Sequence, residues 1–138
     1  MQRRFILIAL LLILSPNAMA GSEDAKTRPN KEELSALTLE ASRLSAQEQN
    51  SRLAQILKDQ AGSQTPRSDF MFCTGLAYLG NYRAQRCVGY AYENGIGIVE
   101  DLTEAYTWYE IALSSGISDE ADAKKAEEDR DRTRDRLV

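Results

Sequence analysis

Histidine is absent from this chain of 138 residues, and that absence narrows the chemistry open to it. The most common metal ligand and general base is missing, so neither a Ser-His-Asp triad nor a Cys-His pair can form. A Cys-x-x-Cys motif is missing as well, and the Gly95-x-Gly97 segment lacks the lysine of a phosphate-binding P-loop. We therefore expect that the protein is not an enzyme. We also expect it to have no catalytic residue, no cofactor and no metal site.

Clusters of positive charge are also missing. The 17 lysines and arginines are interspersed with 21 aspartates and glutamates, which gives a formal net charge of −4. A surface that binds duplex nucleic acid needs clustered lysine and arginine, so we expect no nucleic-acid partner. The length is sufficient for one small domain.

Long apolar runs are missing except near the start. The run Phe5–Leu14 is too short to span a bilayer comfortably. The basic pair Arg3-Arg4 precedes it, and Ala18-Met19-Ala20 follows it as a small-x-small site. These features predict a bacterial-type signal peptide at 1–20 that is cleaved before Gly21. An uncleaved N-terminal anchor is the alternative.

Cleavage would remove two of the 17 basic residues and no acidic residue, so the mature chain would carry 15 against 21, near −6. We expect a periplasmic or secreted protein with no stable membrane insertion after cleavage. Export would also place both cysteines where disulfides can form.

Residues 21–45 are predicted to form a flexible leader and an N-terminal helix. Asn30 and Glu33 have the spacing of a capping box, as do Ser45 and Glu48. Apolar residues recur at helical spacing as far as Gly62, an expected helix stop. Either two helices, 31–44 and 46–61, or one long bent helix fits this pattern. We interpret the apolar stripes as core faces, with a partner-binding amphipathic helix as the alternative.

Two further segments have strong helical patterns. A densely apolar helix is predicted to begin near Ser68 or Asp69 and to end at Leu79, buried on most sides. The stretch 84–116 then predicts a helix–loop–helix hairpin with a loop at Gly95-Ile96-Gly97. Asp101 is the expected cap of its second helix.

This hairpin resembles a Sel1-like repeat, a relative of the tetratricopeptide repeat (TPR). The matching positions are Ala84, Gln85, Gly89, Tyr92, Gly95, Gly97, Asp101, Ala105, Trp108, Tyr109, Ala112 and Gly116. The resemblance implies an all-α fold, a short right-handed α-solenoid of helix–loop–helix repeats. We interpret Trp108 and Tyr109 as core residues rather than a ligand cage.

A second, degenerate copy precedes the main repeat. Phe72 lies 36 residues before Trp108, and Gly80 lies 36 residues before Gly116. We therefore divide a repeat domain at 46–138 into a degenerate repeat (46–81), a main repeat (82–117) and a charged capping helix (118–138). Opposite charges spaced i,i+4 in the last segment, including Lys125 with Asp129, favour a solvated helix.

Cys73 and Cys87 are expected to form a structural disulfide. They lie at similar distances on either side of the Gly80-Asn81 turn, so an antiparallel helix pair brings them together. The bridge would close a 14-residue segment, which contributes about 3 kcal/mol in the chain-entropy model. Two buried free thiols, or a redox pair, are the alternatives. In the Sel1-like family such bridges usually join the helices of one repeat, whereas this one would join adjacent repeats.

The resemblance also implies a function, because Sel1-like proteins usually act as adaptors. We expect non-enzymatic binding of another protein in the periplasm. A secreted enzyme or cell-wall-binding protein is one alternative, and an inhibitor or immunity-type protein that occludes one partner is another. The first helices of such repeats line a concave face, which makes Arg86, Tyr90 and Asn94 the candidate binding residues.

Overall fold

A computed structural model describes residues 25–138, and six α-helices account for its regular secondary structure. The helices are α2 (Lys31–Ser42), α3 (Ala46–Lys58), α4 (Pro66–Tyr78), α5 (Tyr82–Asn94), α6 (Leu102–Ser114) and α7 (Glu120–Leu137). The predicted signal peptide at 1–20 lies outside these residues. Across the described part of the chain, no helix is both long enough and apolar enough to cross a membrane.

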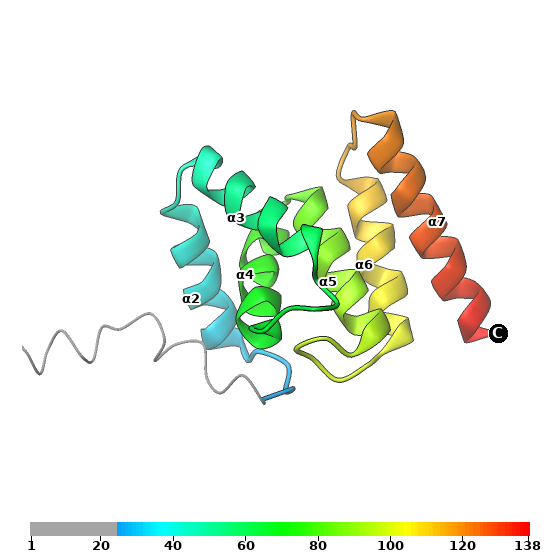
Figure 1. The fold of residues 1–138 in the computed structure, drawn as a ribbon, viewed down its shortest axis with the longest axis horizontal. Coiled ribbons are helices and arrows are strands. Elements are labelled where there is room, and N and C mark those ends of the chain that lie inside the picture. Colours follow the sequence, from blue (N-terminus) through cyan, green and yellow to red (C-terminus); the bar gives the residue numbers. More distant parts are fainter. Residues whose placement is uncertain (1–24) are drawn as a thin grey trace, which may run out of the picture.

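The helices pack in sequence. Figure 1 shows α4, α5, α6 and α7 side by side in chain order, each running opposite to the one before, with α2 on the other side of α4. Helix α3 crosses over and contacts both α4 and α5. The all-α fold is confirmed, and the adjacent packing is consistent with a small helical repeat array.

Capping residues fix where two of the helices begin. The side chain of Asn30 accepts a hydrogen bond from the Glu33 amide, and Ser45 forms a reciprocal capping box with Glu48. Both caps satisfy amides that a first helical turn leaves unpaired, and of the two helices only α3 has a full capping box. The region 31–61 therefore forms two helices rather than one bent helix.

Two predicted helix boundaries were wrong. Helix α3 ends at Lys58 rather than near residue 61, because Asp59 leaves the helical conformation with φ −147° and ψ 58°. Its carboxylate then accepts a hydrogen bond from the Gly62 amide. Helix α4 begins at Pro66, before the expected start, since proline suits the first helical position, where no amide donor is needed.

The helix that packs along α4 is α2. A Cβ atom at Gly75 of α4 would lie 2.7 Å from the carbonyl oxygen of Leu37, so only glycine permits this approach. Helix α3, in contrast, touches α4 over a few residues. The division into repeats at 46–81 and 82–117, and the right-handed sense of the array, stay predictions.

The leader was expected to be flexible, but its last residues lie against the main hairpin. The Lys26 ammonium donates to the Gly95 carbonyl, and the Lys26 carbonyl accepts from the Val99 amide. The Arg28 guanidinium is 2.6 Å from Asp101 and stacks over the Tyr92 ring at 5.5 Å. This segment therefore ties the start of α2 to the loop between α5 and α6.

Candidate functional site

Most of the repeat-signature residues have structural roles in the hairpin of α5 and α6. Gly95 and Gly97 have φ angles of 66° and 74°, a region that favours glycine. A Cβ atom at Gly97 would also overlap the Pro66 carbonyl oxygen. Asp101 caps α6 by accepting from the Glu104 amide at 3.0 Å. The loop conformation and the cap thus follow the sequence pattern.

Most of the remaining signature positions are core or close-approach positions, whereas Gly116 is exposed. Tyr109 is fully buried, and its ring packs where a side chain on Gly89 would stand, with a Cβ atom there 2.7 Å from Cε1. Trp108 is 9% exposed and meets Tyr78 edge-on. Tyr92 and three alanines, Ala84, Ala105 and Ala112, are also buried in the hairpin of α5 and α6. Gly116 follows α6 and has a φ angle of 76°. The aromatic residues are therefore core, and they do not form an open cage.

The expected disulfide joins α4 to α5. Cys73 and Cys87 are bonded, with their Cα atoms 6.2 Å apart, and both are essentially fully buried. The side chain of Gln60 donates to the Cys87 carbonyl at 2.9 Å, so the segment after α3 is anchored beside the bridge. This hydrogen bond fixes the turn after α3 against α5, and Gln60 also lines the cavity described next.

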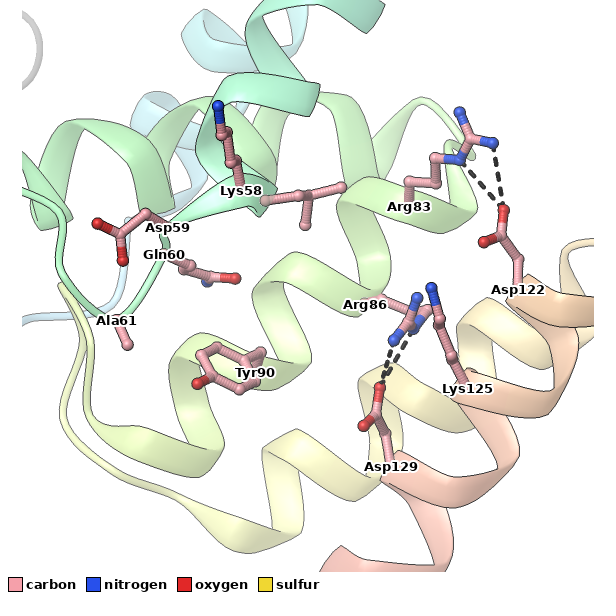
Figure 2. Close-up of a pocket in the computed structure, with 11 residues that line it drawn as sticks. Lys58, Asp59, Gln60, Ala61, Arg83, Arg86, Tyr90, Asp122, Lys125 and Asp129 are labelled. Atoms are coloured by element: carbon pink, nitrogen blue, oxygen red, sulfur yellow. Dashed lines mark hydrogen bonds and ion pairs between the residues drawn. The ribbon is translucent and has the colours of Figure 1, made fainter.

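A groove of about 480 Å³ lies between the C-terminal end of α3, the outer face of α5 and α7. Residues 57–61 form one wall, and α7 contributes Asp122, Lys125 and Asp129 to the other. Figure 2 shows α5 between these walls, with Arg83, Arg86 and Tyr90 on the side that faces the cavity. Helices α3 and α5 are the first helices of the two predicted repeats, which were expected to line a concave face, and the capping helix α7 completes the groove.

Ion pairs across the groove hold α7 on α5. Arg83 donates from Nε and Nη2 to one oxygen of Asp122, at 3.3 and 3.2 Å, and the Tyr82 hydroxyl donates to the same oxygen at 2.7 Å. Arg86 donates in the same way to Asp129 at 3.2 and 2.7 Å. The Tyr82 hydrogen bond, helped by Arg83, holds the pKa of Asp122 below its ordinary value.

The three candidate binding residues do not share one environment. Arg86 and Tyr90 line the groove, and the Arg86 side chain is 21% exposed because Asp129 covers part of it. Asn94 is outside the groove lining, and its side-chain Nδ2 donates a hydrogen bond to the Tyr90 backbone carbonyl at 3.0 Å. A concave surface built from these helices therefore centres on Arg86 and Tyr90.

Sequence reasoning missed the most buried charge in the described chain. Glu93 is 2% exposed, accepts a hydrogen bond from the Tyr109 hydroxyl at 2.7 Å, and pairs with Arg132 at 2.7 and 2.8 Å. Burial acts to raise the pKa of Glu93, but the bonds from Arg132 and Tyr109 outweigh it and lower the pKa overall. Burial, with Glu93 beside it, raises the pKa of Tyr109. The available signal was the position of Glu93 four residues after Gly89, on the face that meets α6.

The i,i+4 spacing of Lys125 and Asp129 does not produce an ion pair between them. Asp129 is shared by Arg86 of α5 and by Arg132, its neighbour at i+3. Lys125 is left with no ion pair to any residue in 25–138 and stands in the groove wall. The reason is geometric: α7 lies beside an arginine-bearing helix, and a bidentate guanidinium competes better for a carboxylate than a flexible ammonium does.

The fold and the groove define a class rather than a family: an all-α protein of six helices packed in sequence, with a charged concavity between α3, α5 and α7. Within residues 25–138, no three acidic or cysteine side chains gather as a metal ion would require. Comparisons of the chain with protein-family models, with curated proteins and with solved structures gave no match.

Proposed function

We propose that this protein is a non-enzymatic adaptor of the Sel1-like, TPR-like type, which binds another protein in the periplasm or outside the cell. The groove between α3, α5 and α7 is its binding surface, and Arg86 and Tyr90 are its central residues. The observation that carries the proposal is the shape and origin of this groove, since one cavity is lined by three alternate helices of the array.

The sequence signature of the main hairpin supports the assignment to Sel1-like repeats. Gly95, Gly97 and Asp101 have the conformations and the cap that such a loop requires. Alternate helices on one face leave a continuous surface, which repeat proteins use for extended partners. The disulfide between α4 and α5 and the apolar run near the start together support an exported protein.

Site-specific crosslinking tests the proposal directly. A photoreactive amino acid replaces Tyr90 in the groove, and in a matched control it replaces Tyr106, which is half-buried on α6 and outside the groove lining. After irradiation in cells that export the protein, we expect a discrete crosslinked product from position 90 and none from position 106. Equal products from both positions, or none from position 90, would contradict the proposed surface.

A further inference from the structure

Four basic side chains from three helices line the same groove. Lys58 comes from the last turn of α3, Arg83 and Arg86 come from α5, and Lys125 comes from α7. Figure 2 shows the side chains of Arg86 and Lys125 close together in this view, between α5 and α7. Convergence of like charges is notable in a chain whose net charge is −4, because such an arrangement favours an anion between them.

Three acidic residues, Asp59, Asp122 and Asp129, also line the groove, one fewer than the basic residues. The Asp59 carboxylate accepts a hydrogen bond from the Gly62 amide and points away from the two arginines in Figure 2. The other two aspartates are paired with the arginines, so the lining keeps a net positive charge.

Arg83 and Arg86 each donate from Nε and Nη2 to one aspartate oxygen, and their Nη1 groups take no part in these bonds. Lys58 and Lys125 form no ion pair within residues 25–138, and Asp129 is also neutralised by Arg132 from outside the groove lining. The arginines are held in place while retaining donors for a ligand.

The groove also offers apolar surface. Leu57 is 39% exposed and Tyr90 is half-buried, and both lie among the basic side chains. A polyphosphate or nucleic-acid backbone would bring dense negative charge close to Asp122 and Asp129 and would leave this apolar surface unused. A peptide that combines carboxylates with apolar side chains would use both features.

We propose that the groove binds an acidic peptide segment of the partner protein. Its aspartate or glutamate side chains pair with the free donors of Arg83 and Arg86 and with the two lysines, and an apolar side chain packs on Leu57 and Tyr90. This proposal rests on the proposed function, because it names the chemistry of the partner at the same site.

The test uses a fluorescein-labelled peptide of alternating glutamate and leucine, with glutamine–leucine and lysine–leucine peptides of equal length for comparison. Fluorescence anisotropy at about 50 mM salt should detect binding of the glutamate peptide, at least tenfold tighter than binding of the other two. Lys125→Glu and Lys58→Glu should each weaken this binding about tenfold. Lys124→Glu is the matched control, since Lys124 is exposed on α7 but outside the groove lining, and it should change the affinity less than twofold.

Several results would overturn the acidic partner. They are equal binding of the glutamine peptide, equal loss in Lys124→Glu, or displacement of the glutamate peptide by millimolar inorganic phosphate. Crosslinking from position 90 that persists unchanged in Lys125→Glu would overturn it too, while leaving the adaptor function intact. Absence of any crosslink from position 90 would instead reject the adaptor function. All three substituted lysines are exposed, so circular dichroism melts of the variants should match the parent.

Discussion

Two parts of this molecule are held together by different forces. Helices α2 to α6 share one apolar cluster that extends from Ala41 to Tyr109 and includes the disulfide. Helix α7 buries only Ala126 and Thr133, and neither belongs to that cluster. Helix α7 packs along α6, and its hydrogen bonds and ion pairs to other helices go mainly to α5, with one ion pair to Glu110 of α6. The last helix is therefore packed like a polar interface, while the rest is packed like a core.

The order of the contacts shows how α7 is aligned. Tyr82 and Arg83 contact Asp122, Arg86 contacts Asp129, and Glu93 contacts Arg132. Residues later in α5 thus contact residues later in α7. The two helices therefore run in the same direction, as Figure 1 also shows. We call this row of contacts between α5 and α7, from Tyr82 with Asp122 to Glu93 with Arg132, the polar seam. Because the groove lies along the polar seam, whatever loosens α7 also opens one wall of the groove.

The largest effect is expected in the apolar part. Phe70 is 2% exposed and meets Tyr92 edge-on at 5.7 Å. Phe70→Ala should lower the free energy of unfolding by about 3–5 kcal/mol, measured by chemical denaturation. The loss should be the same at low and high salt, since no charge is removed. A loss that shrinks with added salt would mean that ionic contacts also hold the core.

The disulfide should have the next largest effect. Replacing Cys73 and Cys87 with alanine opens a loop with a sequence separation of 14, which should cost about 3 kcal/mol of unfolding free energy. Thermal melts of the double variant should show a lower but still single transition. An unchanged melt would mean that the apolar contacts alone fix α4 against α5.

Breaking the polar seam should cost less and should act locally. Arg132→Met leaves the buried Glu93 with Arg136, 3.6 Å away, as its remaining ion-pair partner and with the hydrogen bond from the Tyr109 hydroxyl. Because Arg132 is itself 46% exposed, we expect a loss of about 2 kcal/mol, below the value for fully buried pairs. Hydrogen exchange should increase in α7 and stay unchanged in α4.

The control for this variant is Arg134→Met. Arg134 is 54% exposed, and its ion-pair partners within residues 25–138 are neighbours on its own helix, so the substitution should change stability by less than about 0.5 kcal/mol. Equal effects of the two substitutions would show that the bond to Glu93 contributes no more than a surface charge.

Acid should weaken the same seam with the smallest and most gradual effect. The pKa values of Glu93 and Asp122 are both lowered in the folded protein. Their contribution is complete above the ordinary carboxyl pKa of about 4 and is lost as pH falls through the lowered values. In methyl NMR spectra, Ala126 and Thr133 should shift during acidification before Leu76 does. Simultaneous shifts of all three would contradict a separate polar region.

The features predicted correctly from the sequence depend on short stretches of chain. The loop conformation at Gly95 and Gly97, the helix caps at Asn30 and Asp101 and the capping box of Ser45 with Glu48 each involve a few consecutive residues. The disulfide required only that two helices be antiparallel about one turn. Local backbone chemistry decides such features before the remaining helices are placed.

The features missed depend on how distant helices meet. The bond between Glu93 and Arg132 joins residues 39 positions apart, and nothing near either residue indicates which helix will face it. The packing of α2 along α4 and of Arg28 on the main hairpin are of the same kind. Charges near the end of the chain predicted a solvated helix, whereas several of them pair with α5.

Hydrogen exchange at two salt concentrations tests the difference between the two regions most directly. Amide protection of α7 (Glu120–Leu137) and of α4 (Pro66–Tyr78) is measured at neutral pH, at about 0.05 and about 1 M sodium chloride. The two-region account predicts that added salt lowers the protection of α7 severalfold while that of α4 is retained or increased. Equal changes in both helices, or an α7 insensitive to salt, would contradict it.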